Sequence, residues 1–590
     1  MKNDERDESS RGEEREASES EAVKNEAESD AASESEGASD AENEAESDAP
    51  ASDEKAAAGE NKAPSSDRSA QKSAWNPRPV VTPRVGYALS VLTALLYFLA
   101  FPGTAARPFA FVAFFAFVPW LYAIRGQTPR MALKMSWLMM FVGASCGFYW
   151  LVNMLEVFSG FPLPLCVLFA AILNVYQSGR MAVTGWLYGR ATERGWPHAP
   201  VFIAAFVAGE LVYPLLFPWY AGVTMHDWPI MMQVADLGGP FAVSVMLMGS
   251  NLAIAELIEV YRRMPANRVT MAVGFAVPVI AALYGKIRMS SIDAKVANAE
   301  KIRVGMVQPY NDLFNRRDAL RTHLDMTKEL QKKEPVDLVV WSEAPLGRAF
   351  SEERYKQMVK FDVTGKLGVP SIVGALLVRQ PDRTKDPTAK RDFFNVALMA
   401  DEKGNIIGRY DKQFLLMFGE YLPFGDVFPI MYKWSPNSSK FTPGTSFAPL
   451  EWKGHRISTM ICYEDILPSF VNKLVAAGDP DLFVNLTNDT WFGNTTEPWI
   501  HLALAKFRSI EHRLYLIRVT NSGVSAIVDP NGRVTVHGGV YTKESIIGEA
   551  RFLRERTVYS RIGDAPWWTL SLLVGIAAFR KRKGTNAARS

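Results

Sequence analysis

Cysteine is scarce in this sequence. Only Cys146, Cys166 and Cys462 occur among 590 residues, which excludes a disulfide-bonded secreted scaffold. The sequence also lacks a collagen-like period and a heptad array, and it has no glycine-rich phosphate-binding motif in a suitable context. No cluster of His, Cys, Asp and Glu has metal-ligand spacing. We therefore expect no metal, no nucleotide or other cofactor, and no nucleic-acid partner.

Large apolar side chains are nearly absent from the first 75 residues. Residues 1–70 carry 23 acidic and 8 basic side chains, which leaves a net charge near +17 on the remaining 520 residues. A tract so rich in Glu, Ser, Ala and Asp cannot bury enough apolar surface to offset its conformational entropy. We predict that residues 1–75 form a disordered acidic tail and that no cleavable signal peptide precedes the first apolar run.

Charged residues are in turn rare in a series of long apolar runs behind this tail. Several runs reach the roughly 17–25 residues that a helix needs to cross a bilayer. Buried helices of a soluble protein are the alternative, but so many runs in succession, separated by short basic or aromatic loops, favour membrane helices. The runs cover residues 87–102, 108–124, 132–155, 161–189, 199–219, 231–259, 269–285 and 565–579.

Basic side chains gather in alternate loops between these runs. The loops near Glu156 and His226 contain no Lys or Arg, and only Arg107 lies between the first two runs. The positive-inside rule then predicts eight transmembrane helices with both termini in the cytoplasm. The basic positions are Arg78, Arg84, Arg125, Arg130, Lys134, Arg190, Arg194, Arg262, Arg263, Arg268, Arg580, Lys581, Arg582 and Lys583.

Residues 300–560 have a different texture from the apolar runs. Short β-rich runs such as IRVGMVQ, DLVVWSE and DLFVNLTND alternate with amphipathic stretches, which predicts an α/β domain with a buried sheet. The predicted fold is therefore a membrane domain of seven helices at residues 85–290, an inserted extracytoplasmic α/β domain at 300–560, an eighth helix at 565–580 and a basic cytoplasmic end at 581–590. Within or near the spans, we expect Glu210 and Asp236 to be paired or to line a polar cavity.

Three strand-like runs of the α/β domain end on reactive side chains. VDLVVWSE ends on Glu343, GRYDK carries Lys412 with Glu420 eight residues later, and RISTMIC ends on Cys462. A thiol is a poor nucleophile until it is deprotonated. A carboxylate can take its proton, and an ammonium can hold the negative charge of a tetrahedral intermediate. Together the three residues predict nucleophilic catalysis on an acyl group.

Taken one at a time, these residues also have structural interpretations. A lone buried Cys is usually a small apolar side chain, a Glu after a strand is often a cap, and a Lys in a loop is usually solvated. Cys146 and Cys166 lie inside apolar runs, and we assign both a structural role.

The ordered motifs WSE, YDK, FGEYLPFG, ICYE and NLTNDTWFG resemble those of the carbon–nitrogen hydrolase, or nitrilase, superfamily. Together with ELVYPLLFPWYAG and VADLGGPFAVSVML, and with spans on both sides of the domain, residues 85–580 resemble the apolipoprotein N-acyltransferase family. Ser342 and Met417 stand where that family commonly has proline.

The resemblance implies a four-layer α-β-β-α domain on the periplasmic side of a bacterial inner membrane. It implies that Glu343 is the general base, Lys412 the oxyanion stabiliser and Cys462 the nucleophile. Glu420, Tyr463 and Glu464 are implied to support the site or to shape substrate access; the latter two flank the cysteine. The implied reaction moves an acyl chain from a phospholipid to the α-amino group of a diacylglyceryl-cysteine apolipoprotein through a Cys thioester.

Two other functions are compatible with parts of the sequence. A membrane-tethered amidase of the nitrilase type would use the same three residues with water as the second nucleophile, although a simple anchor needs one span rather than eight. A transporter or receptor with a sensory outer domain would need no reactive cysteine at all.

Overall fold

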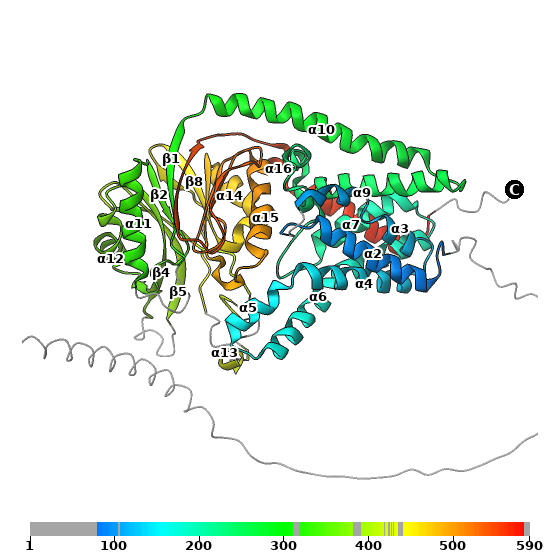
Figure 1. The fold of residues 1–590 in the computed structure, drawn as a ribbon, viewed down its shortest axis with the longest axis horizontal. Coiled ribbons are helices and arrows are strands. Elements are labelled where there is room, and N and C mark those ends of the chain that lie inside the picture. Colours follow the sequence, from blue (N-terminus) through cyan, green and yellow to red (C-terminus); the bar gives the residue numbers. More distant parts are fainter. Residues whose placement is uncertain are drawn as a thin grey trace, which may run out of the picture. The chain divides into compact units, whose positions relative to one another are not determined.

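The computed structural model describes residues 79–103, 107–310, 318–381, 391–417, 419–422, 425, 427–428, 430–434 and 440–582. The predicted acidic tail and residues 583–590 lie outside this range. Helices make up the first part of the described chain (Figure 1). They are α2 (Pro83–Ala100), η1 (Arg107–Phe114), α3 (Val118–Ile124), α4 (Pro129–Gly147), α5 (Trp150–Ser159), α6 (Leu163–Glu193), α7 (His198–Val212), η2 (Ala221–Met225), α8 (Pro229–Met232), α9 (Ala235–Tyr261) and α10 (Arg268–Ala297).

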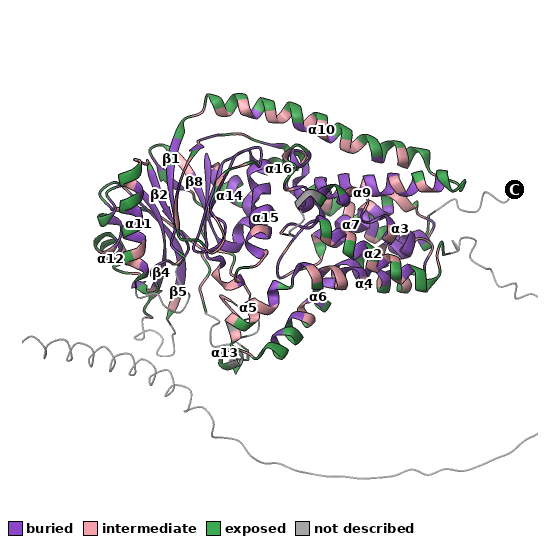
Figure 2. Cartoon of the chain, viewed as in Figure 1, coloured by how far each residue is buried: buried purple, intermediate pink, exposed green. Residues whose placement is uncertain are grey.

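Four of the described helices are long and apolar enough to cross a membrane, namely α2, α6, α9 and α10. The bent pair α4 and α5 makes a fifth if it is counted as one span, and shorter apolar helices cover Phe109–Ile124, His198–Val212 and Ala565–Phe579. Every predicted apolar run thus contains a helix, but eight crossings stay a prediction. Figure 2 shows long exposed stretches on α10, where Val269 and Ile287 are 71% and 72% exposed, as expected for side chains that face lipid.

Two predicted runs differ in shape from single straight helices. The run at 132–155 bends by 61° between α4 and α5, because Phe148 leaves the helical region at φ −112°. The run at 269–285 continues as α10 to Ala297. Its polar extension is held by ion pairs, since Arg288 and Lys295 both contact Glu555 near the end of the α/β domain.

Glu210 and Asp236, two of the acidic residues within the apolar runs, are both paired. The Glu210 carboxylate accepts a hydrogen bond from Arg180 at 2.7 Å, and both side chains are fully buried. Asp236 accepts from Arg288 at 2.8 Å and from Arg513 of the α/β domain at 2.7 Å. A buried charge is tolerated when it is paired in this way, so both acids have the structural role expected from the sequence.

Two sheets form the α/β part. The seven-stranded sheet has the order β13-β1-β2-β4-β5-β6 with β3 beside β4, and the six-stranded sheet has the order β12-β11-β10-β9-β8-β7. The strands are β1 (Lys301–Gln308), β2 (Leu338–Trp341), β3 (Ala349–Ser351), β4 (Ser371–Arg379), β5 (Asp392–Ala400), β6 (Ile406–Asp411), β7 (Leu450–Trp452), β8 (His455–Ile461), β9 (Leu482–Thr487), β10 (Leu516–Thr520), β11 (Ala526–Val528), β12 (Val534–His537) and β13 (Glu544–Arg551).

Helices cover both outer faces of the paired sheets. Figure 1 shows α11 and α12 on one side and α14 and α15 on the other, which gives the α-β-β-α layers. The central strands β2, β8, β9 and β10 are buried along their whole length or nearly so, as expected for strands covered on two faces. The remaining elements are α11 (Ala319–Lys333), α12 (Tyr355–Asp362), η3 (Thr364–Lys366), α13 (Ile430–Trp434), η4 (Cys462–Ile466), α14 (Pro468–Gly478), η5 (Asp489–Phe492), α15 (Glu497–His512), α16 (Val558–Ile562) and α17 (Ala565–Phe579).

A glycine pair in α9 admits the end of the chain. Gly238 and Gly239 leave the helical conformation, and Gly239 has a φ of +64°. A Cβ on Gly239 would lie 2.8 Å from the ring of Tyr559 in α16. The indole of Trp567 in α17 donates to the Gly238 carbonyl at 2.8 Å. The GGP segment therefore breaks α9 where α16 and α17 pack against it.

Candidate active site

The ends of three strands bring the predicted reactive residues together. Glu343 follows β2, Lys412 follows β6 in the same sheet, and Cys462 follows β8 in the other sheet. All three side chains are more than nine-tenths buried. They line one cavity of about 230 Å³, together with Glu420. The site therefore lies where the carboxyl ends of strands from the two sheets meet.

Lys412 lies between two carboxylates. Its Nζ donates to Glu343 Oε1 at 3.1 Å and to Glu420 Oε1 at 2.8 Å. Burial alone would lower the pKa of the Lys412 ammonium, but Glu343 and Glu420 raise this pKa well above its ordinary value. Lys412 is therefore a cation at neutral pH.

Glu343 and Cys462 have raised pKa values. Burial raises the pKa of Glu343, the Lys412 charge lowers it and the Glu420 charge raises it again. Burial also raises the pKa of the Cys462 thiol well above its ordinary value, and the Glu343 carboxylate adds to this rise. The resting sulfur is therefore protonated, and it needs a base before it can attack a carbonyl carbon.

The backbone at the cysteine makes a sharp turn. Cys462 has a φ of +54° where β8 passes into η4, and Ala344 next to Glu343 has a φ of +41°. Residues other than glycine adopt this conformation rarely, and such positions cluster at functional sites. The Cys462 carbonyl is fixed by the Asn485 side chain, which donates to it at 3.0 Å.

Tyr463, the residue after the cysteine, contacts the helical part of the chain. The Tyr463 hydroxyl donates to the carbonyl of Leu216 in the helical part, and its ring stacks on Phe414 with centroids 5.9 Å apart. Tyr463 also lines a small cavity of about 20 Å³ that includes Cys462. Tyr463 thus joins the cysteine turn to the helical part.

Glu464 holds backbone groups around the site. Its Oε1 accepts from the amides of Gln413 and Phe414 at 2.7 and 3.0 Å, and its Oε2 accepts from the amide of Ile461 at 2.8 Å. It therefore ties the segment after Lys412 to the end of β8. Burial raises the pKa of Glu464 to about 7, against the effect of these amides. Among the described residues, Glu464 is absent from the lining of both cavities that contain Cys462.

A buried charge network lies behind the cysteine turn. His501 Nε2 contacts Asp465 at 2.9 Å and its Nδ1 contacts Asp489 at 3.1 Å, while Arg518 bridges the same two carboxylates at 3.0 and 2.8 Å. Burial and Arg518 would lower the pKa of His501, but the two aspartates raise it to about 10. Asp489, His501 and Glu497 bring ligand atoms within 4.8 Å of one another. Two cations already neutralise this group, so it has the chemistry of an ion-pair network.

Comparison with known proteins identifies the family. Residues 93–253 match the family model of the apolipoprotein N-acyltransferase N-terminal domain, and residues 303–555 match the carbon-nitrogen hydrolase model. The apolipoprotein N-acyltransferase of Geobacter metallireducens is 27% identical over 519 residues, which cover 85% of this chain and 96% of that protein. The chain belongs to the apolipoprotein N-acyltransferase family.

A second curated relative has the same name as the first. The apolipoprotein N-acyltransferase of Azotobacter vinelandii is 29% identical over 477 residues, which cover 78% of this chain and 89% of that protein. Among solved structures, Saccharomyces cerevisiae Nit3, a member of branch 10 of the nitrilase superfamily, is 17% identical, with a TM-score of 0.32 and coverage of 45% of this chain and 95% of that one.

Asn395 is a site residue that the sequence analysis missed. It lies in the middle of β5 and is 5% exposed. Its Nδ2 donates to Glu343 Oε1 at 2.7 Å and to Glu420 Oε1 at 3.2 Å. The signal was a single amide in the apolar run DFFNVALMA, since an amide inside a buried strand needs a polar partner. For this apolipoprotein N-acyltransferase family member, Asn395 fixes the Glu343 carboxylate beside Lys412.

Replacement of Glu420 is expected to move the acid side of the pH–rate profile. The Glu420 charge raises the pKa of Glu343. If Glu343 acts as the general base, activity is lost as pH falls through this pKa. In Glu420→Gln that pKa falls, so the acid limb of kcat/KM moves to lower pH. The plateau also falls by roughly tenfold or more, because Lys412 loses a charged hydrogen-bond partner. Acyl transfer rates measured against pH check this, with the exposed Glu402→Gln as control; an unmoved limb contradicts it.

Proposed function

We propose that this family member transfers an acyl chain from a membrane phospholipid to the α-amino group of a diacylglyceryl-cysteine apolipoprotein, with Cys462 as nucleophile, Glu343 as general base and Lys412 as oxyanion stabiliser. The observation that carries the proposal is the common cavity of these three side chains. In it a protonated thiol, a carboxylate with a raised pKa and a buried cation line the same space.

In the first half-reaction, the Glu343 carboxylate takes the proton of the Cys462 thiol. The thiolate attacks the ester carbonyl of the phospholipid, and a C–S bond forms. The Lys412 ammonium holds the negative charge of the tetrahedral oxyanion. When the C–O bond breaks, Glu343 gives its proton to the departing lysophospholipid alcohol, which leaves an acyl thioester on Cys462.

In the second half-reaction, the acceptor amine attacks the thioester carbonyl. A C–N bond forms, and Glu343 takes a proton from the amine. The C–S bond then breaks, and Glu343 returns that proton to the sulfur. The products are an amide and the resting thiol, with Glu343 again a carboxylate. Water must be kept from the thioester for the amine to compete, and the apolar side chains of Met154, Leu416 and Phe492 form part of the cavity wall.

Both proposed substrates are anchored in the bilayer, so the catalytic cavity must lie close to the membrane surface. The cavity wall includes Met154 of α5, a helix of the apolar series. We infer eight crossings, made by α2, η1 with α3, α4 with α5, α6, α7, α9, α10 and α17. The catalytic domain then lies on the periplasmic side of the inner membrane with both termini in the cytoplasm, as the distribution of basic loops favours.

An acyl adduct on Cys462 is the expected result of incubating the purified protein with phospholipid in the absence of an acceptor. Mass spectrometry of the peptide that contains Cys462 should show the mass of one fatty acyl chain. Hydroxylamine at neutral pH or a synthetic diacylglyceryl-cysteine peptide should remove the chain, and the peptide should gain it as an amide. Cys146→Ala and Cys166→Ala proteins serve as matched controls and should form the same adduct. An unmodified peptide amine together with cleavage of small amides would instead favour an amidase.

A further inference from the structure

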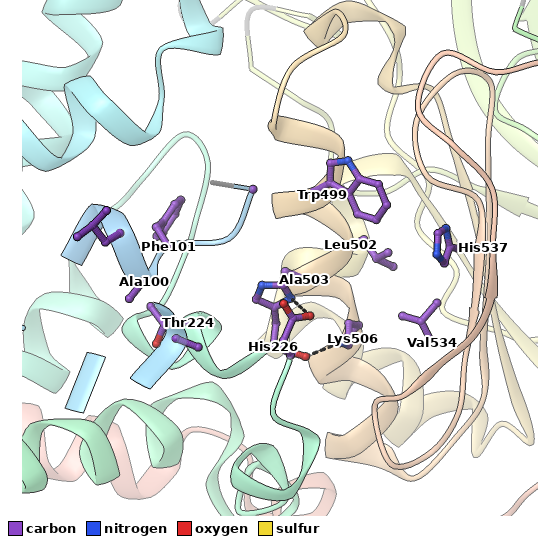
Figure 3. Close-up of a pocket in the computed structure, with 14 residues that line it drawn as sticks. Ala100, Phe101, Thr224, His226, Trp499, Leu502, Ala503, Lys506, Val534 and His537 are labelled. Atoms are coloured by element: carbon purple, nitrogen blue, oxygen red, sulfur yellow. Dashed lines mark hydrogen bonds and ion pairs between the residues drawn. The ribbon is translucent and has the colours of Figure 1, made fainter. Parts of the chain in front are cut away.

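A second cavity lies on another face of α15. It has a volume of about 310 Å³, and its described lining shares no residue with the cavity that contains Glu343 and Lys412. Trp499, Leu502, Ala503 and Lys506 project into it from α15 at helical spacing (Figure 3). The end of α2, with Ala100 and Phe101, and the loop at His226 complete the walls. Such a volume is typical of a small ligand site.

A buried ammonium in this cavity has no carboxylate within ion-pair distance among the described residues. Lys506 is 5% exposed, and its Nζ donates to the carbonyl of His226 (Figure 3). A lysine ammonium has three donors, and no carboxylate of the described chain lies within 4.0 Å of Lys506 to receive the others. Burial lowers the pKa of Lys506 to about 8, although the more distant charges of Asp227 and Asp529 oppose this shift. A buried cation is costly unless it is paired, so an anion from outside the chain would stabilise it.

The other charged groups of this cavity lie toward its rim. The Asp227 carboxylate is 41% exposed and contacts the His226 ring at 3.2 Å. The His537 ring is also exposed, and its Nδ1 contacts the Gly538 carbonyl at 2.8 Å. Lys506 is therefore the one buried charged side chain among the described residues that line the cavity. Its charge selects an anion over a cation.

An exposed apolar stripe on α2 leads to this cavity. Leu92, Leu95 and Leu99 occur at helical spacing on α2 and are 44%, 46% and 39% exposed. Leu99 itself lines the cavity. Because α2 is one of the four helices that are long and apolar enough to cross a membrane, the stripe offers an acyl chain a surface that ends beside the Lys506 ammonium.

We propose that this cavity binds the phosphate group of a bilayer phospholipid through Lys506, with the acyl chains lying along Leu92, Leu95 and Leu99. This lipid is not the acyl donor, since it is held away from Cys462 by the thickness of α15, whose Ile500 and Leu504 line the cavity beside the cysteine. A phosphodiester carries one negative charge and presents free oxygen acceptors, which match one ammonium with two unused donors. The proposal rests on the membrane placement of α2 and not on the acyl transfer chemistry.

Lipid retention by the full-length protein tests this proposal. The background is Cys462→Ser, so that no bound lipid is consumed. The delipidated protein in detergent is titrated with phosphatidylglycerol, and native mass spectrometry counts the lipids that each chain retains. We expect Lys506→Met to lower the affinity for the most tightly bound lipid by roughly tenfold or more, because a charged hydrogen bond is lost. Leu99→Glu, which adds a negative charge at the cavity mouth without altering a buried position, should have a similar effect.

The control arms separate the sources of the anion. Lys473→Met, at an exposed position on α14, should bind as the background does. Diacylglycerol with the same chains should not replace the tight lipid, and inorganic phosphate at millimolar concentration should not compete. Equal retention by Lys506→Met and the background overturns the proposal. So does diacylglycerol binding of equal strength, and competition by inorganic phosphate assigns the cavity to a free phosphate instead. If Lys506→Met does not fold, undiminished retention by Leu99→Glu overturns the proposal.

Discussion

Lys412→Met is expected to lower the rate of acyl transfer by about 10⁴-fold. Loss of one oxyanion donor costs about 10²–10³ in kcat. Removal of this cation also leaves Glu343 and Glu420 buried without the ammonium that contacts both at 3.1 and 2.8 Å. Since Lys412 lowers the pKa of Glu343, that pKa rises further in the variant. The base is then protonated over more of the working pH range, which adds to the loss of rate.

Stability should change in the same variant, with a definite pH dependence. Breaking a buried ion pair costs about 3–5 kcal/mol. In Lys412→Met the folded-state pKa of Glu343 lies further above its ordinary value of 4.5, so the folded protein binds more protons than the unfolded chain above that pH. Its stability therefore falls as pH rises through this window. Thermal unfolding at pH 5.5 and pH 8 measures this, and the variant should lose more stability at pH 8.

A matched control separates the site from a general charge effect. Lys403→Met removes an exposed lysine of the β5–β6 turn and should leave both rate and stability nearly unchanged. Acyl transfer by Lys412→Met within tenfold of the parent protein would show that the oxyanion is held by another group.

The sequence placed the three candidate residues at the ends of strand-like runs, and in the structure their side chains line one cavity. In the structure β2 and β6 run in the same direction within one sheet, so both end at the same edge and bring Glu343 and Lys412 near each other. The number of residues between Glu343 and Cys462 does not indicate whether their side chains lie close together. The contact between the two sheets, which sets Cys462 against the other two residues, depends on packing that no local pattern encodes.

Asn395 was not predicted from the sequence, and neither were the hydrogen-bond partners of Glu464. Asn395 is one polar residue in a buried strand, and the strand pattern alone does not say which carboxylates it will face. Glu464 was expected to support the site or to shape substrate access. In the structure its carboxylate accepts hydrogen bonds from the backbone amides of Gln413 and Ile461. Backbone amides are present at every residue, so their partners emerge only when the loops are placed in space.

The membrane helices show a similar division between pattern and packing. Apolar runs predicted where helices lie, because burial in lipid requires an uninterrupted apolar surface. They did not predict the 61° bend after α4 or the extension of α10 to Ala297. The extension depends on Glu555, which is far away in the sequence and pairs with Arg288 and Lys295. Contacts between distant segments therefore set the helix ends, while composition sets the helix centres.

Cys462→Ser is expected to lower acyl transfer by about 10⁴-fold while leaving the protein folded. Serine is close in size to cysteine, so the buried turn with its φ of +54° should persist. A hydroxyl holds its proton far more tightly than a thiol, so the Glu343 carboxylate cannot generate the nucleophile at a comparable rate. Any acyl group that did form would be an oxygen ester, which reacts with an amine more slowly than a thioester does.

Cys462→Ala tests the same prediction, because alanine has no side-chain nucleophile at all. If the sulfur is the nucleophile, both variants should retain only the residual rate that binding and the remaining groups supply, as happens when one member of a catalytic set is removed. Cys146→Ser, at a partly buried cysteine in α4, should keep the parental rate. Radiolabelled phospholipid and a diacylglyceryl-cysteine peptide provide the assay, and circular dichroism checks the fold. A Cys462→Ser protein with the parental rate would mean that the acyl chain never resides on this side chain.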